Sequence, residues 1–258
     1  MAGGVHSRLV HDRAFTDVPD ILLFLAAFAT ALTSAVLGLG GGVLLMLLMP
    51  GLLPPSAIVP VHAVVQSISN GARMAFAHRF IAWRLLPPLL LGSALGAVLG
   101  GQLVGLISLE WLPVVAGAVI LVVTWLPLVG WLPMGRAGMV ALGFYQTTLG
   151  MVAGATGPLG AAVLSRISGE REWLVVNTAV YMTVNHLVRG MAFGLLGFVY
   201  WPWLDTVLSM GVAGLLGTAL GTRLRQGLPQ RNFLPLFKII VSLLAVRMMV
   251  YAIVELTG

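Results

Sequence analysis

The chain has no cysteine and very few charged residues. Of its 258 residues, 9% are charged and none is cysteine, whereas 59% are hydrophobic and the mean hydropathy is +1.02. The absence of cysteine excludes disulfides, thiolate metal sites and any relay of sulfur through a thiol. A soluble globular domain has about 25% charged residues. This composition therefore excludes a soluble globule and indicates an integral membrane protein.

Acidic residues are scarce where membrane chemistry would need them. Beyond the amino-terminal tail they lie at the ends of apolar segments or between them: Glu110, Glu170, Glu172, Asp205 and Glu255. No buried carboxylate is therefore expected to serve as a conventional sodium or proton site. The sequence also shows no metal-ligand spacing and no nucleophile paired with a base, since Ser165 and Ser168 are expected in a loop. We therefore expect no enzymatic activity, no catalytic residue, no metal and no cofactor.

Ten apolar segments follow a polar tail at residues 1–20. They lie at about 21–37, 43–53, 57–77, 85–107, 111–129, 137–153, 158–166, 174–199, 203–222 and 233–255. A helix needs about 20 residues to cross the hydrocarbon, so 43–53 and 158–166 are too short to cross upright. Each is expected to form a hairpin of broken helices with the segment before it. The predicted fold class is an all-α polytopic membrane protein with about eight to ten membrane segments.

The glycine-rich break after the first segment returns later in the chain. The run Gly38-Leu39-Gly40-Gly41-Gly42 has a weaker copy, Gly154-Ala155-Thr156-Gly157-Pro158, 116 residues later. The same offset pairs Arg73 with Arg189 and places Asn70 opposite His186. With five extra residues in the second copy, 95–103 aligns with 216–224. The sequence therefore predicts two repeats, at 21–130 and 136–256, each with a broken-helix hairpin and three transmembrane helices.

The arginines between the apolar segments indicate how the repeats are oriented. If each hairpin counted as one crossing, the loops would place five arginines on each side of the membrane. If each hairpin enters and leaves on the same side, eight arginines share one face and only Arg8 and Arg13 lie opposite. The second arrangement obeys the positive-inside tendency. It makes the two repeats inverted, with both termini outside and a site expected at the repeat interface near the bilayer midplane.

Three features occur in order in the first half of the chain. They are the glycine-rich turn after a first apolar helix, the break Pro50-Gly51-Leu52-Leu53-Pro54 and the polar helix through Gln66, Asn70 and Arg73, and a second, weaker copy follows. Together these features resemble the TauE/SafE family of sulfite and organosulfonate exporters, over nearly the whole chain from residue 21. The resemblance implies an integral membrane carrier of small sulfur oxyanions such as sulfite, sulfoacetate or sulfolactate. The second copy departs from the pattern at Thr156 and Pro158, so the two half-sites are expected to differ.

The glycine turns are candidates for anion binding. Unwound backbone followed by a helix start offers N–H groups and the positive end of a helix dipole to an anion. The alternative is that these glycines only allow close helix packing, which we favour for the isolated Gly96, Gly100, Gly217 and Gly221. The candidate substrate-binding residues in the turns are Gly38, Gly40, Gly41 and Gly42 in the first copy, and Gly154, Thr156 and Gly157 in the second.

Polar residues at three- and four-residue steps supply the other candidates. His62, Gln66, Asn70 and Arg73 share one helix face, with Ser69 beside Asn70, and Asn177, Tyr181, Asn185 and Arg189 share another, with Thr178 and His186 beside them. Polar groups at such depth are functional candidates, although hydrogen bonding between helices suffices for Ser69, Thr178 and His62. The candidate substrate contacts are Gln66, Asn70, Arg73, Asn185, His186 and Arg189. Either arginine could instead extend to the cytoplasmic headgroups.

Two further groups have weaker indications. His186 could titrate near neutral pH and carry a coupling proton, or stay neutral and donate one hydrogen bond. Tyr145, Gln146, Thr147 and Thr148 precede the second break and could contact the ligand.

These observations predict a multi-pass carrier in the bacterial inner membrane that exports a small oxyanion, with sulfite or an organosulfonate such as sulfoacetate favoured. Membrane potential would drive export, with a proton as an optional companion. Uptake by the same fold and an anion channel stay open as alternatives, and a membrane-embedded enzyme is disfavoured. The net charge of +6 suits lipid headgroups rather than nucleic acid, because the arginines lie in short loops. Assembly into a homo-oligomer also stays open.

Overall fold

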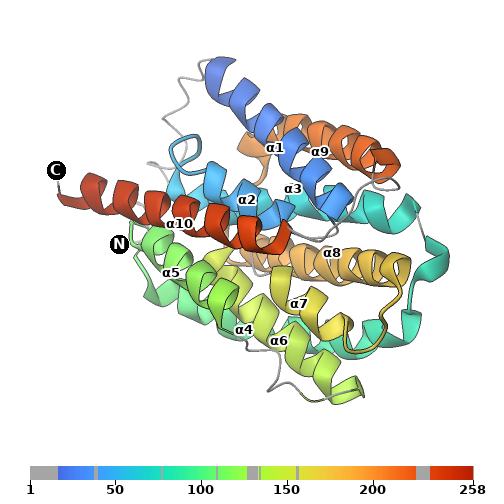
Figure 1. Cartoon of the computed structure of the whole chain (residues 1–258). Helices are drawn as coiled ribbons and strands as arrows, with labels where there is room; N and C mark the ends of the chain where they lie inside the picture. The colour runs from blue at the N-terminus through green and yellow to red at the C-terminus, as the bar shows by residue number, and fades with distance from the viewer. Residues whose placement is uncertain are drawn as a thin grey trace.

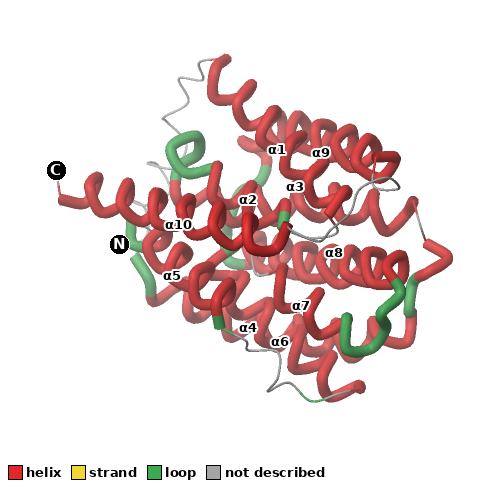
Figure 2. The backbone as a smooth tube through the Cα atoms, in the orientation of Figure 1, coloured by secondary structure: helices red, strands yellow, loops and turns green. Residues whose placement is uncertain are grey.

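A computed structural model describes residues 17–37, 40–76, 78–108, 110–126, 133, 135–154, 157–224 and 233–257. Within these ranges the chain folds into α-helices, short 3-10 helices and connecting turns (Figure 1, Figure 2). The first five helices are α1 (Asp17–Leu37), α2 (Gly41–Leu48), α3 (Pro55–Phe76), α4 (Leu86–Leu106) and α5 (Leu112–Trp125). The next five are α6 (Gly135–Ala153), α7 (Gly157–Leu164), α8 (Arg171–Leu195), α9 (Leu204–Leu224) and α10 (Phe233–Thr257).

Each predicted apolar segment overlaps one of these helices, which confirms the all-α membrane fold. The largest shift of a helix end is at α2, which ends at Leu48 and not near residue 53, because the chain turns between Pro50 and Pro54. Gly51 has φ +82° in this turn, a left-handed conformation that glycine adopts without strain. The other clear difference is at α8, which ends at Leu195 and not near residue 199, because Gly197 turns the chain with φ +94°.

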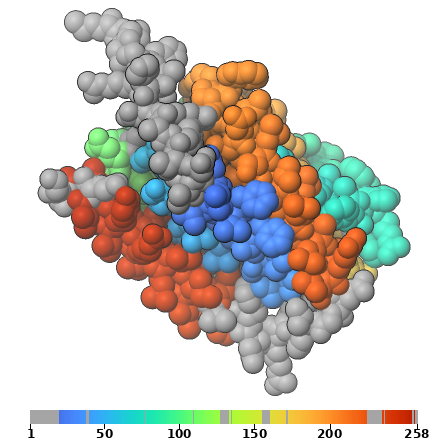
Figure 3. All heavy atoms as spheres, turned by 90° about the horizontal axis from the view of Figure 1, so that it is seen from above, coloured from blue at the N-terminus to red at the C-terminus, as the bar shows by residue number. Residues whose placement is uncertain are grey.

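Four helices are long and apolar enough to cross a membrane within the described residues. They are Asp20–Leu37, Trp83–Leu106, Trp201–Leu224 and Phe237–Val254. Seen from above in Figure 3, α1, α9 and α10 lie on one face, and exposed leucines such as Leu25, Leu208 and Leu243 cover these three helices. Helices α3 and α8 carry the polar stripes, which lowers their hydropathy, and most of their residues are buried. They therefore form the interior of the bundle, and the apolar helices form its lipid-facing surface.

The two halves pack on each other through matching contacts. Helix α4 packs most extensively on α6, and α9 packs in the same way on α1. A Cβ added at Gly96 would collide with the Phe144 carbonyl, and one at Gly217 with the Phe28 carbonyl. Phe144 and Phe28 are themselves 116 residues apart. Equivalent positions therefore make equivalent contacts, which supports the two-fold repeat. Gly100 and Gly221 also face a neighbouring helix closely, as expected for packing glycines.

Corresponding helices of the two halves run in opposite directions. A Cβ at Gly71 of α3 would lie 3.9 Å from Thr183 Cγ2 of α8, and one at Gly190 of α8 would lie 3.6 Å from Val64 Cγ2 of α3. Helices α5 and α10 are also antiparallel. Gly117 faces Met249, whereas Trp125, further along α5, donates to Ser242, which lies earlier in α10. These directions support inverted repeats, because counting each hairpin as one crossing would make the same helices parallel.

Candidate polar site at the two helix breaks

Both predicted helix breaks are present, and each is formed by a glycine with positive φ. Gly40 has φ +95° at the start of α2, and Gly154 has φ +71° at the end of α6. Gly157 begins α7. The predicted site residues Gly38 and Thr156 lie outside the described residues. Left-handed backbone is common only for glycine, so residue type explains why the chain reverses at these two points.

The glycines around the breaks allow close packing. Cβ atoms at Gly40, Gly41 and Gly154 would collide with Phe237, with the Thr30 carbonyl and with Met46 respectively. Gly42 differs, because its Cβ would lie 3.4 Å from Gln66 Cδ and therefore faces the polar stripe of α3. The contact of Gly154 with Met46 of α2 also brings the second break against the first half. Gly40, Gly41 and Gly154 therefore allow neighbouring groups to pack closely against the breaks.

The two predicted arginines occupy equivalent places in the two halves. Arg73 donates from Nη2 to Ser34 Oγ at 2.8 Å, and Arg189 donates from Nη1 to the Gly150 carbonyl at 2.7 Å. Ser34 and Gly150 are 116 residues apart, as the arginines are. Arg189 Nη1 also donates to the Gly154 carbonyl at 2.5 Å. Each arginine, 2–3% exposed, therefore holds the end of the first helix of its own half and does not reach headgroups.

A continuous chain of polar contacts joins the two breaks. His62 Nε2 donates to the Gly42 carbonyl at 2.8 Å, and the His62 ring meets the His186 ring edge-on with centroids 5.4 Å apart. Arg189 Nη2 donates to His186 Nδ1, and Arg189 Nη1 reaches Gly154. The chain thus runs from Gly42 through His62, His186 and Arg189 to Gly154. It crosses from the first half of the protein to the second.

The same contacts define the tautomers of both histidines. An arginine can only donate hydrogen bonds, so His186 Nδ1 is the acceptor and a neutral His186 carries its proton on Nε2. A carbonyl oxygen can only accept, so His62 carries a proton on Nε2. A doubly protonated His186 would point an N–H at a guanidinium, so the neutral ring is the form that fits this arrangement.

Three donor atoms near this chain have no hydrogen-bond partner within the described part of the protein. They are Asn185 Nδ2, His186 Nε2 and Arg189 Nε, all buried on α8. Residues 185, 186 and 189 lie within about 100° of one another around a helix. The other groups of these side chains are occupied, since Asn185 Oδ1 accepts from Thr147 Oγ1 at 2.6 Å. Buried donors without acceptors are costly, and an anion would satisfy them.

Asn70 on the polar stripe of α3 is hydrogen-bonded within its own helix. Asn70 Nδ2 donates to the backbone and side-chain oxygens of Gln66 on its own helix, at 2.8 and 3.2 Å. Because α3 and α8 are antiparallel, with Val64 beside Gly190 and Gly71 beside Thr183, Arg73 and Arg189 lie toward opposite ends of the crossing. The distance from residue 64 to residue 73 along α3 is about 13 Å. Arg73 and Arg189 therefore contact different helix ends, at Ser34 and at Gly150.

The four polar residues before the second break have separate positions. Tyr145 is 53% exposed, whereas Gln146, Thr147 and Thr148 are buried. Thr148 donates to the Gly96 carbonyl at 3.1 Å, and Thr147 fixes Asn185. Thr147 therefore contacts the polar cluster of α8 through Asn185.

Sequence reasoning missed one contact of this site. The sequence indicates hydrogen bonding between helices for His62, and its bond from α3 to the Gly42 carbonyl of α2 is of that kind, but the contact of its ring with His186 was not predicted. The signal available was its place at the start of the α3 stripe, four residues before Gln66. Its partner on α8 depends on how the halves cross, which no local pattern contains. Within the described residues, no group of three or more His, Cys, Asp or Glu side chains is arranged to hold a metal ion.

The architecture defines a class. An all-helical bundle with a lipid-facing apolar surface and a polar interior at two broken helices is a multi-pass membrane protein of the transporter type. Residues 23–248 match the sulfite exporter TauE/SafE family, so the chain belongs to that family of membrane transporters. No curated protein and no solved structure matches the chain.

Proposed function

We propose that this protein exports a small sulfur oxyanion, sulfite or an organosulfonate such as sulfoacetate, across the bacterial inner membrane. Membership of the sulfite exporter family supports this class of substrate. The observation that carries the proposal is the set of buried donors Asn185 Nδ2, His186 Nε2 and Arg189 Nε beside the second helix break. Oxyanions accept several hydrogen bonds at once, and a charge-assisted bond contributes about 1.5–3 kcal/mol.

The electrical energetics favour export without another fuel. A membrane that is negative inside drives each negative charge outward with about 2.3 kcal/mol per 100 mV. A proton that moved with a monoanion would cancel its charge and replace the voltage dependence by a pH dependence. Voltage-driven export is therefore the simpler mechanism, and proton coupling through His186 is its variant.

Within this proposal Arg189 contributes its charge and its Nε–H. Both terminal nitrogens already have protein partners, Gly150 and Gly154 on one side and His186 on the other. The guanidinium is thereby held in one orientation at the second break. The anion would meet a fixed cation and the three N–H donors of α8 that have no partner among the described residues, and charge-assisted hydrogen bonds of this kind stabilise a buried negative charge.

Sulfite and sulfoacetate binding to purified variants tests this proposal. Arg189→Ala should weaken binding by about ten- to more than a hundredfold. Arg189→Lys should fail nearly as badly, because an ammonium cannot hold both helix-end carbonyls and His186 in the same plane. Arg73→Ala is the matched control, since Arg73 holds the equivalent helix end in the first half. Its loss should slow capture from the cytoplasmic side more than it weakens the closed complex.

Folding must be measured beside binding, because Arg189 also stabilises the α6 end. The melting temperature of each variant serves as the control. A well-folded Arg189→Ala protein that bound both anions within about twofold of the parent, below 0.5 kcal/mol, would eliminate Arg189 as a ligand contact.

A further inference from the structure

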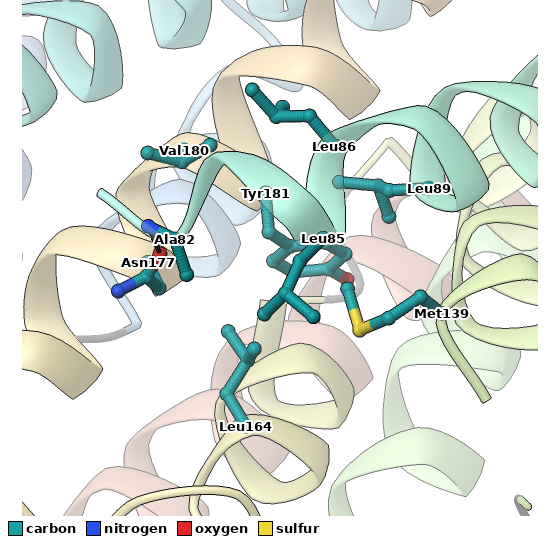
Figure 4. Close-up of a pocket in the computed structure, with 9 residues that line it drawn as sticks. All are labelled: Ala82, Leu85, Leu86, Leu89, Met139, Leu164, Asn177, Val180 and Tyr181. Atoms are coloured by element: carbon teal, nitrogen blue, oxygen red, sulfur yellow. Dashed lines mark hydrogen bonds between the residues drawn. The ribbon is translucent and has the colours of Figure 1, made fainter. Parts of the chain in front are cut away.

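A second polar location lies on α8, nearer its start than the helix breaks. A small pocket is lined by residues of α4, α6, α7, α8 and the segment that leads from α3 into α4 (Figure 4). Its lining is apolar except at Asn177 and Tyr181, which are four residues apart on α8. The same four-residue step leads from Tyr181 to Asn185 and from Asn185 to Arg189. One polar stripe therefore runs from this pocket to the donors at the second break.

Tyr181 brings an unsatisfied hydroxyl to the pocket. Its side chain is 1% exposed, and its hydroxyl has no hydrogen-bond partner within the described residues. In Figure 4 the Tyr181 ring lies among the pocket residues near Leu85 and Met139. A Cβ at Gly160 of α7 would collide with this ring. Gly160 therefore allows the ring to lie directly against the α7 backbone, which fixes where the hydroxyl is held.

Asn177 closes the side of the pocket formed by the α3–α4 linker. Its Oδ1 accepts from the Ala82 N–H at 2.8 Å, and its Nδ2 donates to the Phe80 carbonyl at 2.9 Å. Nδ2 also donates to the Trp173 carbonyl on α8 itself at 2.8 Å. A single side chain thus joins two backbone groups of the linker to α8. Removing this side chain would free the linker and would cost α8 only the side-chain bond to Trp173, not a backbone hydrogen bond.

The linker also carries positive charge on its exposed side. Arg79 and Arg84 are exposed, and Arg79 lies over the Phe80 ring at 5.0 Å from its centroid. Fixed cations at the mouth of a narrow path raise the local concentration of an anion. The arginine distribution predicts that this face is cytoplasmic, which is the face from which an exporter takes its substrate.

We propose that the pocket beneath the α3–α4 linker is the cytoplasmic entrance subsite for a small oxyanion, with the Tyr181 hydroxyl as its contact and Asn177 as the latch that holds the linker closed. The anion then passes along α8 from Tyr181 to Asn185 and the donors at the second break. The assignment rests on the proposed export function for the identity of the ligand. Three observations support the subsite independently: the Tyr181 hydroxyl has no partner among the described residues, a pocket surrounds it, and Asn177 makes two hydrogen bonds to the linker.

Thiol labelling of single-cysteine variants tests the subsite, because the chain has no native cysteine. Leu164→Cys places a thiol in the pocket lining, at a side chain that is 1% exposed. The control is Ile58→Cys, at a side chain 3% exposed in a second pocket whose lining has no polar side chain. Inside-out membrane vesicles present the expected cytoplasmic face to an impermeant maleimide for Leu164→Cys, and right-side-out vesicles present the opposite face, toward which Ile58 lies, for the control. Sulfoacetate serves as the anion, because sulfite itself consumes maleimides.

Asn177→Ala should raise the labelling rate of Leu164→Cys by about tenfold and leave Ile58→Cys unchanged. Sulfoacetate should slow the labelling of Leu164→Cys. Tyr181→Phe, which removes only the hydroxyl, should raise the sulfoacetate concentration needed for half protection by about tenfold, and it should not change the rate without anion. If Asn177→Ala does not fold, Asn177→Asp replaces it, since the carboxylate keeps an acceptor for Ala82 and loses the donor to Phe80.

Three results would overturn the subsite. They are an Asn177 variant that changes the Leu164→Cys rate by less than twofold, an equal change at Ile58→Cys, and full sulfoacetate protection in Tyr181→Phe at the parental concentration. Failure of the proposed function gives a different pattern. Purified parent protein would then bind neither sulfite nor sulfoacetate, while the response of Leu164→Cys to the Asn177 variant would still be seen.

Discussion

The two halves of the protein place an arginine at the same position and use it differently. In the first half Arg73 meets a serine hydroxyl, Ser34, on α1. In the second half the equivalent residue is Gly150, and Arg189 reaches the backbone carbonyl of α6 directly. A glycine at this place lets the guanidinium come against the helix end, where it also meets Gly154 and His186.

The polar stripes show the same contrast. On α3, Asn70 is bonded to Gln66 on its own helix. On α8, donors of Asn185, His186 and Arg189 have no partner among the described residues. A repeat therefore preserves where the helices break and cross, while single substitutions decide which half keeps its donors available. The second half, whose glycine pattern is the weaker one in the sequence, is therefore the half in which we propose the anion contacts.

The largest expected effect is on topology, where the result is all or none. Single cysteines beside Arg79, Arg136 and Arg166 should all be labelled from the cytoplasm, because inverted halves place these loops on one face. The prediction also puts the loop at Arg225 on that face, and the amino-terminal tail and Gly258 outside. Impermeant maleimide applied to intact cells and to inside-out vesicles measures this. Finding the loops at Arg79 and Arg225 on opposite sides would discard the inverted arrangement.

Giving the second half the serine that the first half has at this position should weaken anion binding. In Gly150→Ser the new Cβ would lie 2.7 Å from Arg189 Nη1, so the guanidinium must move away from the helix end. Overpacking of this kind costs about 1–3 kcal/mol, and we expect sulfite affinity to fall by about tenfold or more. The reverse change, Ser34→Gly, should leave affinity within about twofold. Equal losses in both variants, measured by binding and melting temperature, would contradict the difference between the halves.

A smaller effect is expected from His186→Gln. The first half has an amide side chain, Asn70, at the equivalent position, and the substitution puts an amide in the second half as well. Glutamine can still accept from Arg189 and donate one hydrogen bond, but it does not titrate. Voltage-driven sulfite flux should persist, and any part of its pH dependence that arises from His186 should be lost. Proteoliposome flux with voltage and pH gradient set independently measures both. An unchanged pH profile would remove His186 from any coupling step.

The smallest effect is expected away from the α8 donors. Ser69 and Thr218 share a buried hydrogen bond at 3.1 Å between α3 and α9. Thr218→Val removes one partner and should lower stability by about 1–3 kcal/mol, the cost of a buried polar group left unpaired. Thermal unfolding in detergent measures this. Anion affinity should stay unchanged, and a tenfold loss would place a ligand contact beside Ser69 and Thr218.

The sequence by itself determined the membrane class, the position of each helix and the two breaks. These features depend on local properties. About 20 apolar residues are needed to span the hydrocarbon, and left-handed turns favour glycine. The offset of 116 residues also relates contacts that the structure shows, such as Gly96 with Phe144 and Gly217 with Phe28. The family, too, was recognisable from the glycine and proline breaks.

Only the tertiary structure decided which polar groups meet. The antiparallel crossing of α3 and α8 brings His62 to His186 and separates Arg73 from Arg189. It also uses the terminal nitrogens of Arg189 for protein contacts and joins Asn177 to the linker before α4. Helix periodicity states which side chains share a face, but not which face of another helix they contact. That choice depends on packing between residues far apart in the chain, and so it exists only in the folded bundle.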